Sequence, residues 1–166
     1  AQPFCLWTHF MDTHAPYVSG AGRTWYRQTP DYLKALGHRT DYGPGIVFDL
    51  KPQQPEDEQG FSALYDAAVL STDREIGRVI DALDQLGLRD DTLVVISGDH
   101  GEELGEHGNW GHYFLLYEHN TRVPMIFHHP SFDERRISEL TTIMDFAPTV
   151  TELLGVPPVD NWEGRP

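Results

Sequence analysis

The chain has 166 residues, 39% of them apolar, which is enough for one ordinary domain with a hydrophobic core. Twelve Lys and Arg stand against 26 Asp and Glu, and the formal net charge of -14 disfavours nucleic acid and anionic membranes as partners. A single cysteine, Cys5, excludes a disulfide framework or a Cys-based zinc site within the chain, and no run of about 18 apolar residues is present to span a bilayer.

The N-terminal third combines one apolar stretch with a long irregular segment. Residues 3–10, "PFCLWTHF", are apolar and aromatic, and they predict a short buried strand. Residues 18–60 are rich in Gly, Pro and Gln without a regular period, and they predict a loop-rich insertion.

A long helix is predicted next, from Ser62 to Leu86. Ser62 suits an N-cap, and Gly87 suits a C-terminal stop. Apolar residues at helical spacing predict one buried face: Tyr65, Val69, Ile76, Ile80, Leu83 and Leu86. Asp73 falls among them, so we expect a buried carboxylate in a structural ion pair or a cap.

The second half predicts two strands and one more helix. Residues 93–96 and 122–127 are short apolar strands. The segment "MDFAPTVTELLG" predicts a helix with Asp145 near its start, Pro148 in its first turn and Gly155 as its stop. The order strand, helix, strand, strand, helix predicts an α/β fold with a mainly parallel sheet.

Two candidate site residues follow a predicted strand. In "SGDHGE", Asp99 and His100 come at the carboxyl end of strand 93–96, the edge at which open α/β sheets bind ligands. A carboxylate beside an imidazole suits a divalent ion: calcium, magnesium or manganese where oxygen ligands complete the site, and zinc where nitrogen ligands do. The alternative is a turn in which Asp99 caps the next helix and His100 is solvated.

Other histidines are candidates for the same site. His14 lies in "THFMDTHAPY", and we expect the following Ala-Pro to hold it in an extended, rigid segment. A fixed imidazole there could hydrogen-bond an anionic oxygen or protonate a leaving group. In "HGNWGHYFLLYEHNTRVP", His107 and His112 could face the same pocket as His100. The alternative for each histidine alone is a structural side chain with satisfied hydrogen bonds.

Four blocks of the sequence together resemble the sulfatase family of the alkaline phosphatase superfamily. They occur in the family's order: "FCLWTHFMDTHAPY", "YDAAVLSTDREIGRVIDALDQLGLRDDTLVVISGDHGEELGEHG", "GHYFLLYEHNTRVPMIF" and "TTIMDFAPTVTELLGVP". The resemblance implies a three-layer α/β/α sandwich with a largely parallel sheet, and hydrolysis of small-molecule or saccharide sulfate esters. It also implies one divalent ion, calcium with magnesium or manganese as alternatives, and a formylglycine nucleophile made from Cys or Ser.

The resemblance further implies roles for four residues. Asp99 and His100 match two metal ligands, with His100 where many members have Asn. His14 resembles the histidine that contacts the sulfate group. His112 falls where many members have an anion-binding Lys, although its distance to "LYE" differs by one residue from the commonest form of the family. A neutral imidazole at this position would make the site pH-sensitive. His14 and His112 are thus the candidate catalytic and substrate-binding residues. The other polar residues of the stretch are expected to be loop or helix-start residues: Glu102, Glu103, Glu106 and His107.

Part of the family pattern is absent from these residues. The upstream Asp-Asp metal pair and the Cys- or Ser-x-Pro-x-Arg nucleophile motif are not present, and Cys5 lacks that context. The resemblance therefore implies that residues 1–166 are the middle and later part of a single catalytic domain, truncated at both ends. Two ligands seldom hold calcium or magnesium tightly, so we expect the isolated chain to bind metal weakly and to turn over nothing measurable.

Two alternatives to a sulfatase stay open. One is a phosphoesterase or phosphonate monoester hydrolase of the same superfamily, and the other is a non-catalytic metal- or anion-binding module. Because many relatives are exported, the resemblance favours a periplasmic or secreted location over a cytoplasmic one.

Overall fold

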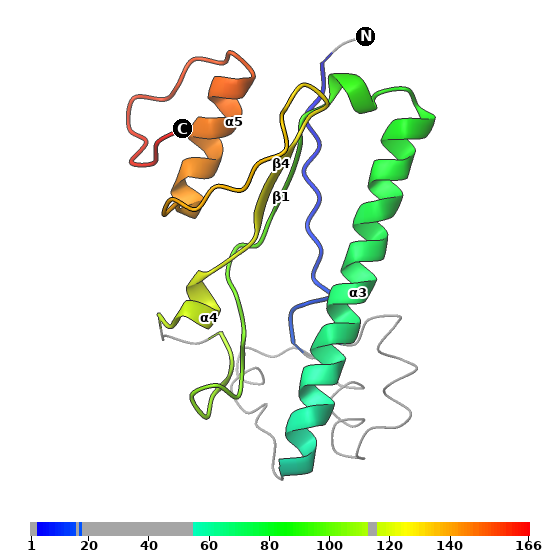
Figure 1. Cartoon of the computed structure of the whole chain (residues 1–166), viewed down its shortest axis with the longest axis vertical. Helices are drawn as coiled ribbons and strands as arrows, with labels where there is room; N and C mark the ends of the chain where they lie inside the picture. The colour runs from blue at the N-terminus through cyan, green and yellow to red at the C-terminus, as the bar shows by residue number, and fades with distance from the viewer. Residues whose placement is uncertain (1–2, 16, 18–54, 113–115) are drawn as a thin grey trace. The chain divides into compact units, whose positions relative to one another are not determined.

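The computed structural model describes residues 3–15, 17, 55–112 and 116–166 (Figure 1). The chain divides into two compact units, Ala1–His129 and Pro130–Pro166. Helices and strands are combined in the larger unit, which confirms the mixed α and β composition predicted from the sequence. The assignment of residues 1–166 to a single catalytic domain stays a prediction.

Helix α3 runs from Pro55 to Gln85 and therefore begins earlier than predicted. Residues 55–60 are helical, so the predicted loop was wrong there, while residues 18–54 lie outside the described residues. Proline is favoured at the first helical position, because the N–H that it lacks would have no partner there. The predicted stop is confirmed: Gly87 has φ +66°, and the N–H of Leu88 reaches back to the carbonyl of Leu83 at 2.9 Å.

The residues that α3 buries lie near its N-terminal end: Phe61, Leu64, Ala67 and Ala68. Tyr65 packs against this cluster, as predicted. Further along, Ile76, Ile80 and Leu83 are partly buried. The prediction is wrong for Val69, which is 44% exposed, and for Leu86, which is 70% exposed. Asp73 is also exposed, so the predicted buried carboxylate is wrong. Helical spacing fixes which residues share a face, but it does not fix which part of that face meets a partner.

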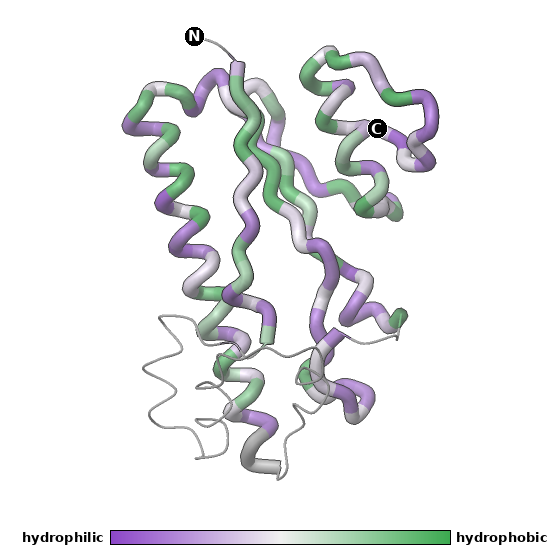
Figure 2. Tube along the Cα trace, turned by 180° about the vertical axis from the view of Figure 1, so that it is seen from behind, coloured by the Kyte–Doolittle hydropathy of each residue, from purple (hydrophilic) through white to green (hydrophobic). Residues whose placement is uncertain are grey.

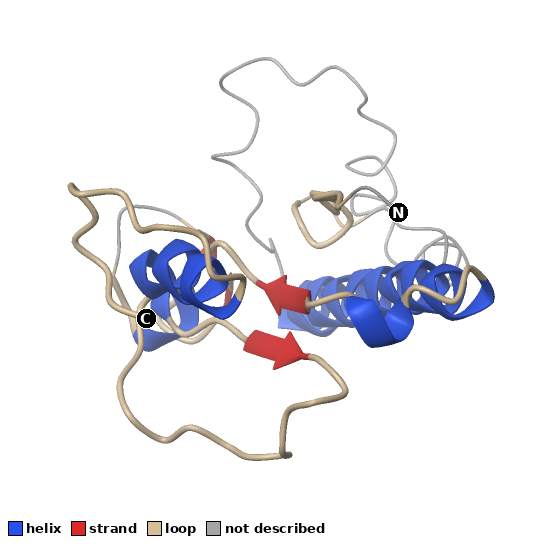
Figure 3. Ribbon diagram, turned by 90° about the horizontal axis from the view of Figure 1, so that it is seen from above, coloured by secondary structure: helices blue, strands red, loops and turns tan. Residues whose placement is uncertain are grey.

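Strands β1 (Val94–Ser97) and β4 (Met125–His128) form an antiparallel pair (red in Figure 3). A 3-10 turn, η2 (Arg89–Asp91), precedes β1. Both strand pairs in the described residues are antiparallel, so the predicted mainly parallel sheet is not found in this part of the chain. The reason is the connection: the chain returns to the end where β1 stops, whereas a parallel return would have to cross to the opposite end of the sheet. The three-layer arrangement stays a prediction.

A hydrophobic core joins segments that are far apart in the sequence. Strand β2 (Glu103–Leu104) pairs antiparallel with β3 (Trp110–Gly111), and one turn of helix, α4 (Glu118–Thr121), follows. Trp110 is buried, and its ring lies 5.2 Å from that of Phe61, measured between centroids. Ala15 and Tyr17 complete the same core. The core therefore fixes the N-terminal segment, α3 and the β2–β3 hairpin near one another.

The N-terminal segment forms no strand over residues 3–10. It runs extended (blue in Figure 1) and is largely apolar (green in Figure 2), yet Phe4, Leu6 and Trp7 are 57%, 65% and 75% exposed. The predicted buried strand was therefore wrong. An apolar stretch becomes a buried strand only where it finds a ladder partner, and β1 and β4 pair with each other instead.

The Pro130–Pro166 unit contains the 3-10 turn η3 (Ile143–Asp145) and helix α5 (Phe146–Leu153). Asp145 lies directly before α5, Pro148 is buried in its first turn, and Gly155, with φ +65°, follows its end. The predicted start, first-turn proline and stop of this helix are therefore confirmed. Across the described part of the chain, no helix has the length and apolar character that crossing a membrane requires.

Candidate functional site

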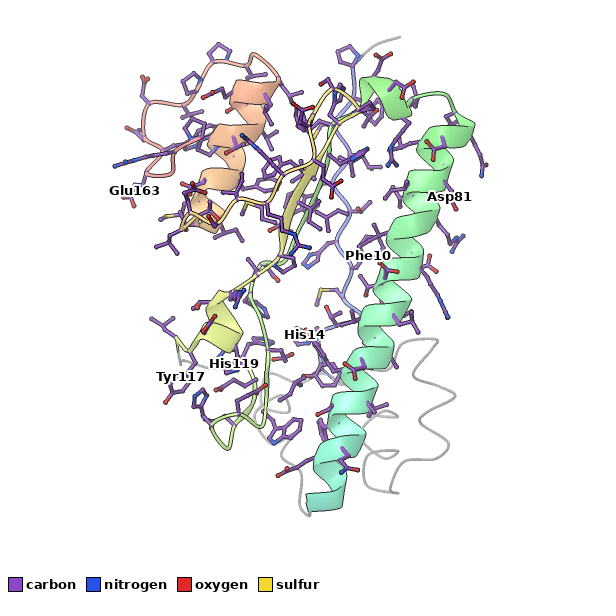
Figure 4. All side chains as sticks on the ribbon, viewed as in Figure 1. Phe10, His14, Asp81, Tyr117, His119 and Glu163 are labelled. Carbon is purple, nitrogen blue, oxygen red and sulfur yellow. The ribbon has the colours of Figure 1, made fainter. Side chains whose placement is uncertain are left out.

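His14 lies in a tight turn that leads into the hydrophobic core. Its N–H donates to the carbonyl of Met11 at 3.1 Å, and its own carbonyl accepts from the N–H of Tyr17 at 3.2 Å. The predicted extended conformation was wrong, because the restriction imposed by proline acts on Ala15, the residue directly before it. Ala15 and Tyr17 are buried, so the turn holds the imidazole beside the core, between α3 and the loop after β1 (Figure 4).

Asp99 and His100 follow β1 after one residue, Gly98, and their loop is attached to α4. The N–H of Gly101 donates to the carbonyl of Asn120 at 2.8 Å. A Cβ at Gly101 would collide with the carbonyl oxygen of His119. Glycine therefore allows the two backbones to meet, and this contact fixes where His100 lies.

The side chain of Asp99 is held as a carboxylate beside His100. Desolvation raises its pKa, but the backbone N–H groups of Asp99 and His100 and the charges of His100 and His9 act the other way and outweigh it. The net effect is a pKa below the ordinary value. The Nδ1 of His100 donates to the carbonyl of Gly101 at 2.8 Å, and its Nε2 lies 3.9 Å from Asp99 Oδ1.

His112 follows Gly111, whose φ of +98° turns the chain at the end of β3. Its Nδ1 lies 2.9 Å from Oε1 of Glu102, and Oε2 of Glu102 accepts from the hydroxyl of Tyr17, also at 2.9 Å. The side chain of Glu102 is 4% exposed. A buried carboxylate therefore connects His112 to the core residue Tyr17.

Three imidazoles converge beside Asp99. The ring centroids of His100 and His112 are 4.0 Å apart, and those of His14 and His112 are 5.0 Å apart. Each ring has its Nδ1 paired with an oxygen: a backbone carbonyl for His14 and His100, and a carboxylate for His112. Nε2 is then the ring atom left for a ligand in all three, which is typical of functional histidines held by outer partners.

Asp99 and His100 have the donor atoms that a shared ion needs. Metal–oxygen and metal–nitrogen bonds are about 2.0–2.6 Å long, so donors 3.9 Å apart can both reach one ion. The lowered pKa of Asp99 favours the charged form that binds a cation. Among the described residues, no group of three or more His, Cys, Asp or Glu is arranged to hold an ion, so these two side chains alone do not make a complete ligand set.

His107 does not join these imidazoles. Its Nδ1 lies 2.8 Å from Oε1 of the fully buried Glu103, and its ring stacks on that of Tyr117 at 3.7 Å. Tyr117 and His119 lie on the α4 side of the loop (Figure 4). The sequence-based option that His107 shares a pocket with His100 is therefore wrong.

Two residues that contact the site were missed by the sequence analysis. Glu102 was expected to be only a loop or helix-start residue, and Tyr17 was given no role. The hydrogen bond between them spans 85 positions. No local spacing signals such a contact, although a Glu directly after Asp-His-Gly in a stretch with several histidines is a reason to test for an imidazole partner.

Comparison with known proteins gives consistent matches. A family model described as Sulfatase matches residues 1–156. Choline-sulfatase from Rhizobium meliloti is 28% identical over 171 residues, which covers 93% of this chain and 32% of the relative. Iduronate 2-sulfatase from Homo sapiens is 37% identical over 105 residues, covering 63% of this chain and 17% of the relative. The structure of a phosphonate monoester hydrolase from Silicibacter pomeroyi superposes with a TM-score of 0.65 at 26% identity, covering 91% of this chain and 32% of that one.

These matches place the chain among hydrolases of the alkaline-phosphatase-like superfamily. Within it, the chain belongs to the sulfatase family, as the resemblance in the sequence predicted. The chain spans about a third or less of the length of these relatives.

Proposed function

We propose that the protein carrying this chain hydrolyses sulfate esters, and that the chain supplies part of the metal and sulfate site. The observation that supports this most strongly is the convergence of His14, His100 and His112 beside Asp99. These residues come from three separate segments, and all four match positions that the family resemblance had implicated. In this proposal, Asp99 and His100 bind the metal, and His14 and His112 bind the sulfate group.

The two anion-binding histidines would act through Nε2. The Nδ1 of His14 is committed to the carbonyl of Ala15 at 2.8 Å, and that of His112 to Glu102 at 2.9 Å. An Nε2–H would donate to a sulfate oxygen, or would pass its proton to the oxygen of the leaving group. Because the outer hydrogen bonds already fix both rings, little reorganisation would be needed when the substrate binds.

The metal that fits this donor set is a hard divalent ion. Calcium is expected from the family, and magnesium or manganese would also accept a carboxylate with an imidazole. When bound, the ion would stabilise the negative charge on the transferring group. The remaining ligands and the formylglycine nucleophile would come from outside these residues. The names of the curated relatives support a small-molecule or saccharide sulfate ester as substrate.

A phosphonate monoester hydrolase is the second candidate. The structural match to the Silicibacter pomeroyi enzyme favours it, because that match covers 91% of this chain. Imidazole donors and a divalent ion would serve a phosphonate oxygen as well as a sulfate oxygen.

Sulfate binding to the chain tests the proposed site. With calcium present, a titration of sulfate followed by NMR of the histidine rings should shift the Nε2 signals of His14 and His112. His128 is the control, because it is exposed at the end of β4 and contacts Arg89 at 3.2 Å. If His14 and His112 shift no more than His128, the site assignment is wrong. Repeating the titration with methylphosphonate compares the two candidate functions.

A further inference from the structure

The carboxylate of Glu102 is buried and fully engaged. Its side chain is 4% exposed, and each of its two oxygens has a partner. A buried charge is costly unless it is paired and hydrogen-bonded, so such a residue is held in one place by its contacts. Glu102 therefore has a fixed position between the core and the candidate site.

On the core side, Tyr17 fixes Glu102. Tyr17 is 2% exposed, and its φ of +51° is uncommon for a residue with a side chain. Its ring packs edge to face on Tyr65 at 5.3 Å and on Phe61 at 6.5 Å, measured between centroids. The surrounding core stabilises this unusual backbone conformation, which directs the hydroxyl to Glu102.

On the site side, Glu102 fixes His112. A carboxylate that accepts from Nδ1–H sets both the tautomer and the orientation of an imidazole. The ring so held lies in contact with His100 and near His14. Rotation of His112 would break the 2.9 Å contact to Glu102 and leave a buried carboxylate oxygen without a partner.

We propose that Glu102 is a positioning residue, which holds His112 with Nε2 available to the anion, and that Tyr17 holds Glu102 in turn. The identity of the anion rests on the proposed function, whereas the orientation of His112 does not. This role explains why a histidine can stand where many family members have a lysine: the shorter imidazole is held in place from behind by a carboxylate.

The chain contains a matched control for this arrangement. Glu103, the next residue, is fully buried and contacts the Nδ1 of His107 at 2.8 Å. In both pairs a buried carboxylate contacts an imidazole Nδ1, but Glu103 Oε2 has no hydrogen-bond partner among the described residues, and His107 stacks on Tyr117 rather than on the candidate site histidines. Substitution of Glu103 should therefore change His107 and leave His112 as it was.

The first test is the tautomer of His112 in the absence of any anion, from the nitrogen signals of its ring. The native chain should show Nδ1–H protected from exchange with water. Glu102→Ala should abolish that protection. Glu102→Gln should retain it, because the side-chain carbonyl accepts the same hydrogen bond. Glu103→Ala should leave it unchanged. The proposal is overturned if Glu102→Ala leaves the tautomer and the protection of His112 as in the native chain.

Tyr17→Phe keeps the aromatic core and removes only the hydroxyl, so it tests the same contact even where Glu102→Ala fails to fold. We expect faster exchange of the His112 Nδ1–H in this variant, and an unchanged rate would show that Tyr17 does not hold Glu102.

The second test is sulfate affinity. Glu102→Ala should weaken sulfate binding by about 10-fold, the lower end of the effect seen when a partner that orients a functional histidine is lost. Glu102→Gln should recover most of that loss. A native chain that shows the predicted tautomer but binds neither sulfate nor methylphosphonate would contradict the proposed function and leave the positioning of His112 supported. Equal sulfate affinity in the native chain and in a folded Glu102→Ala variant would overturn the positioning role.

Discussion

Burial and nearby negative charge both raise the pKa of Tyr65. Burial raises the pKa of the phenol most, and the carboxylates of Glu102 and then Asp66 raise it further. Because the pKa of Tyr65 is higher in the folded chain than in the unfolded chain, neutral Tyr65 contributes to stability. This contribution is fully present below the unfolded pKa of about 10, and it is lost as the pH rises through the folded pKa. Tyr65 therefore reports on the charge of Glu102 without being part of the candidate site.

We expect Glu102→Gln to lower the pKa of Tyr65, because it removes one of the negative charges that oppose ionisation. Alkaline titration of the Tyr65 ring signal by NMR measures this shift. Glu103→Gln is the control, since Glu103 does not contribute to the raised pKa of Tyr65. Equal Tyr65 titration curves for the native chain and Glu102→Gln would contradict the contribution of Glu102 to the raised pKa of Tyr65.

Also at the residue scale, sequence reasoning could find only residues that a motif carries. Asp99, His100 and His112 lie within one stretch, and His14 lies in a second recognisable block, so the resemblance identified all four. Glu102 could not be assigned, because its role depends on Tyr17, which the fold brings near from 85 positions away. Composition and spacing hold no information on such a contact.

At the scale of elements, local signals predicted helix ends well. Gly87 and Gly155 both follow a helix with positive φ, because glycine adopts that conformation without steric cost. Strand pairing was predicted less well, since the direction of β4 depends on the path of the whole connection from β1. The apolar segment 3–10 shows the same limit, because a strand also needs a partner that the segment itself does not specify.

Two glycines should respond in opposite ways to alanine. Gly101→Ala should destabilise the chain by about 1–3 kcal/mol, because the new Cβ meets the carbonyl of His119. Gly77→Ala, within α3, should stabilise it by about 0.5–1 kcal/mol, because nothing lies within 4 Å of the new Cβ and alanine favours the helix. Urea unfolding measures both free energies. Equal effects of the two substitutions would contradict the close approach of the β1 loop to α4.

The start of α5 should be sensitive to acid. The N–H groups of Arg165 and Thr142 donate to the carboxylate of Asp145 and lower its pKa. Because the folded pKa lies below the unfolded value of 3.8, the hydrogen bonds to the ionised carboxylate of Asp145 contribute to stability above pH 3.8. That contribution is lost as the pH falls through the folded pKa.

We therefore expect the amide protons of the first turn of α5 to lose protection below about pH 4 in the native chain. Asp145→Asn should make this protection less dependent on pH. Asp160→Asn, at an exposed carboxylate of the same unit, is the control. A native-like acid transition in Asp145→Asn would show that Asp145 is not the group that titrates.

At the scale of the whole molecule, the candidate site is incomplete in the described residues. Asp99 and His100 are the two proposed metal ligands, and in the part of the chain that the structure describes no group of three or more His, Cys, Asp or Glu is arranged to hold a metal ion. Because the chain spans about a third or less of its relatives, catalysis is proposed for the complete protein. The family could be inferred from the sequence, since the four blocks together are specific, whereas the antiparallel pairing and the contacts of Glu102 required coordinates.

Turnover of a sulfate ester by the complete protein, compared between Asp99→Asn and Asp81→Asn, tests the proposed site most directly. Asp81 is an exposed carboxylate on α3, away from His14 (Figure 4), so its substitution should leave kcat/KM nearly unchanged. Asp99→Asn should lower kcat/KM by at least about 100-fold, because a metal ion that stabilises charge in the transition state contributes several kcal/mol. Equal kcat/KM for the two variants would show that Asp99 takes no part in the reaction.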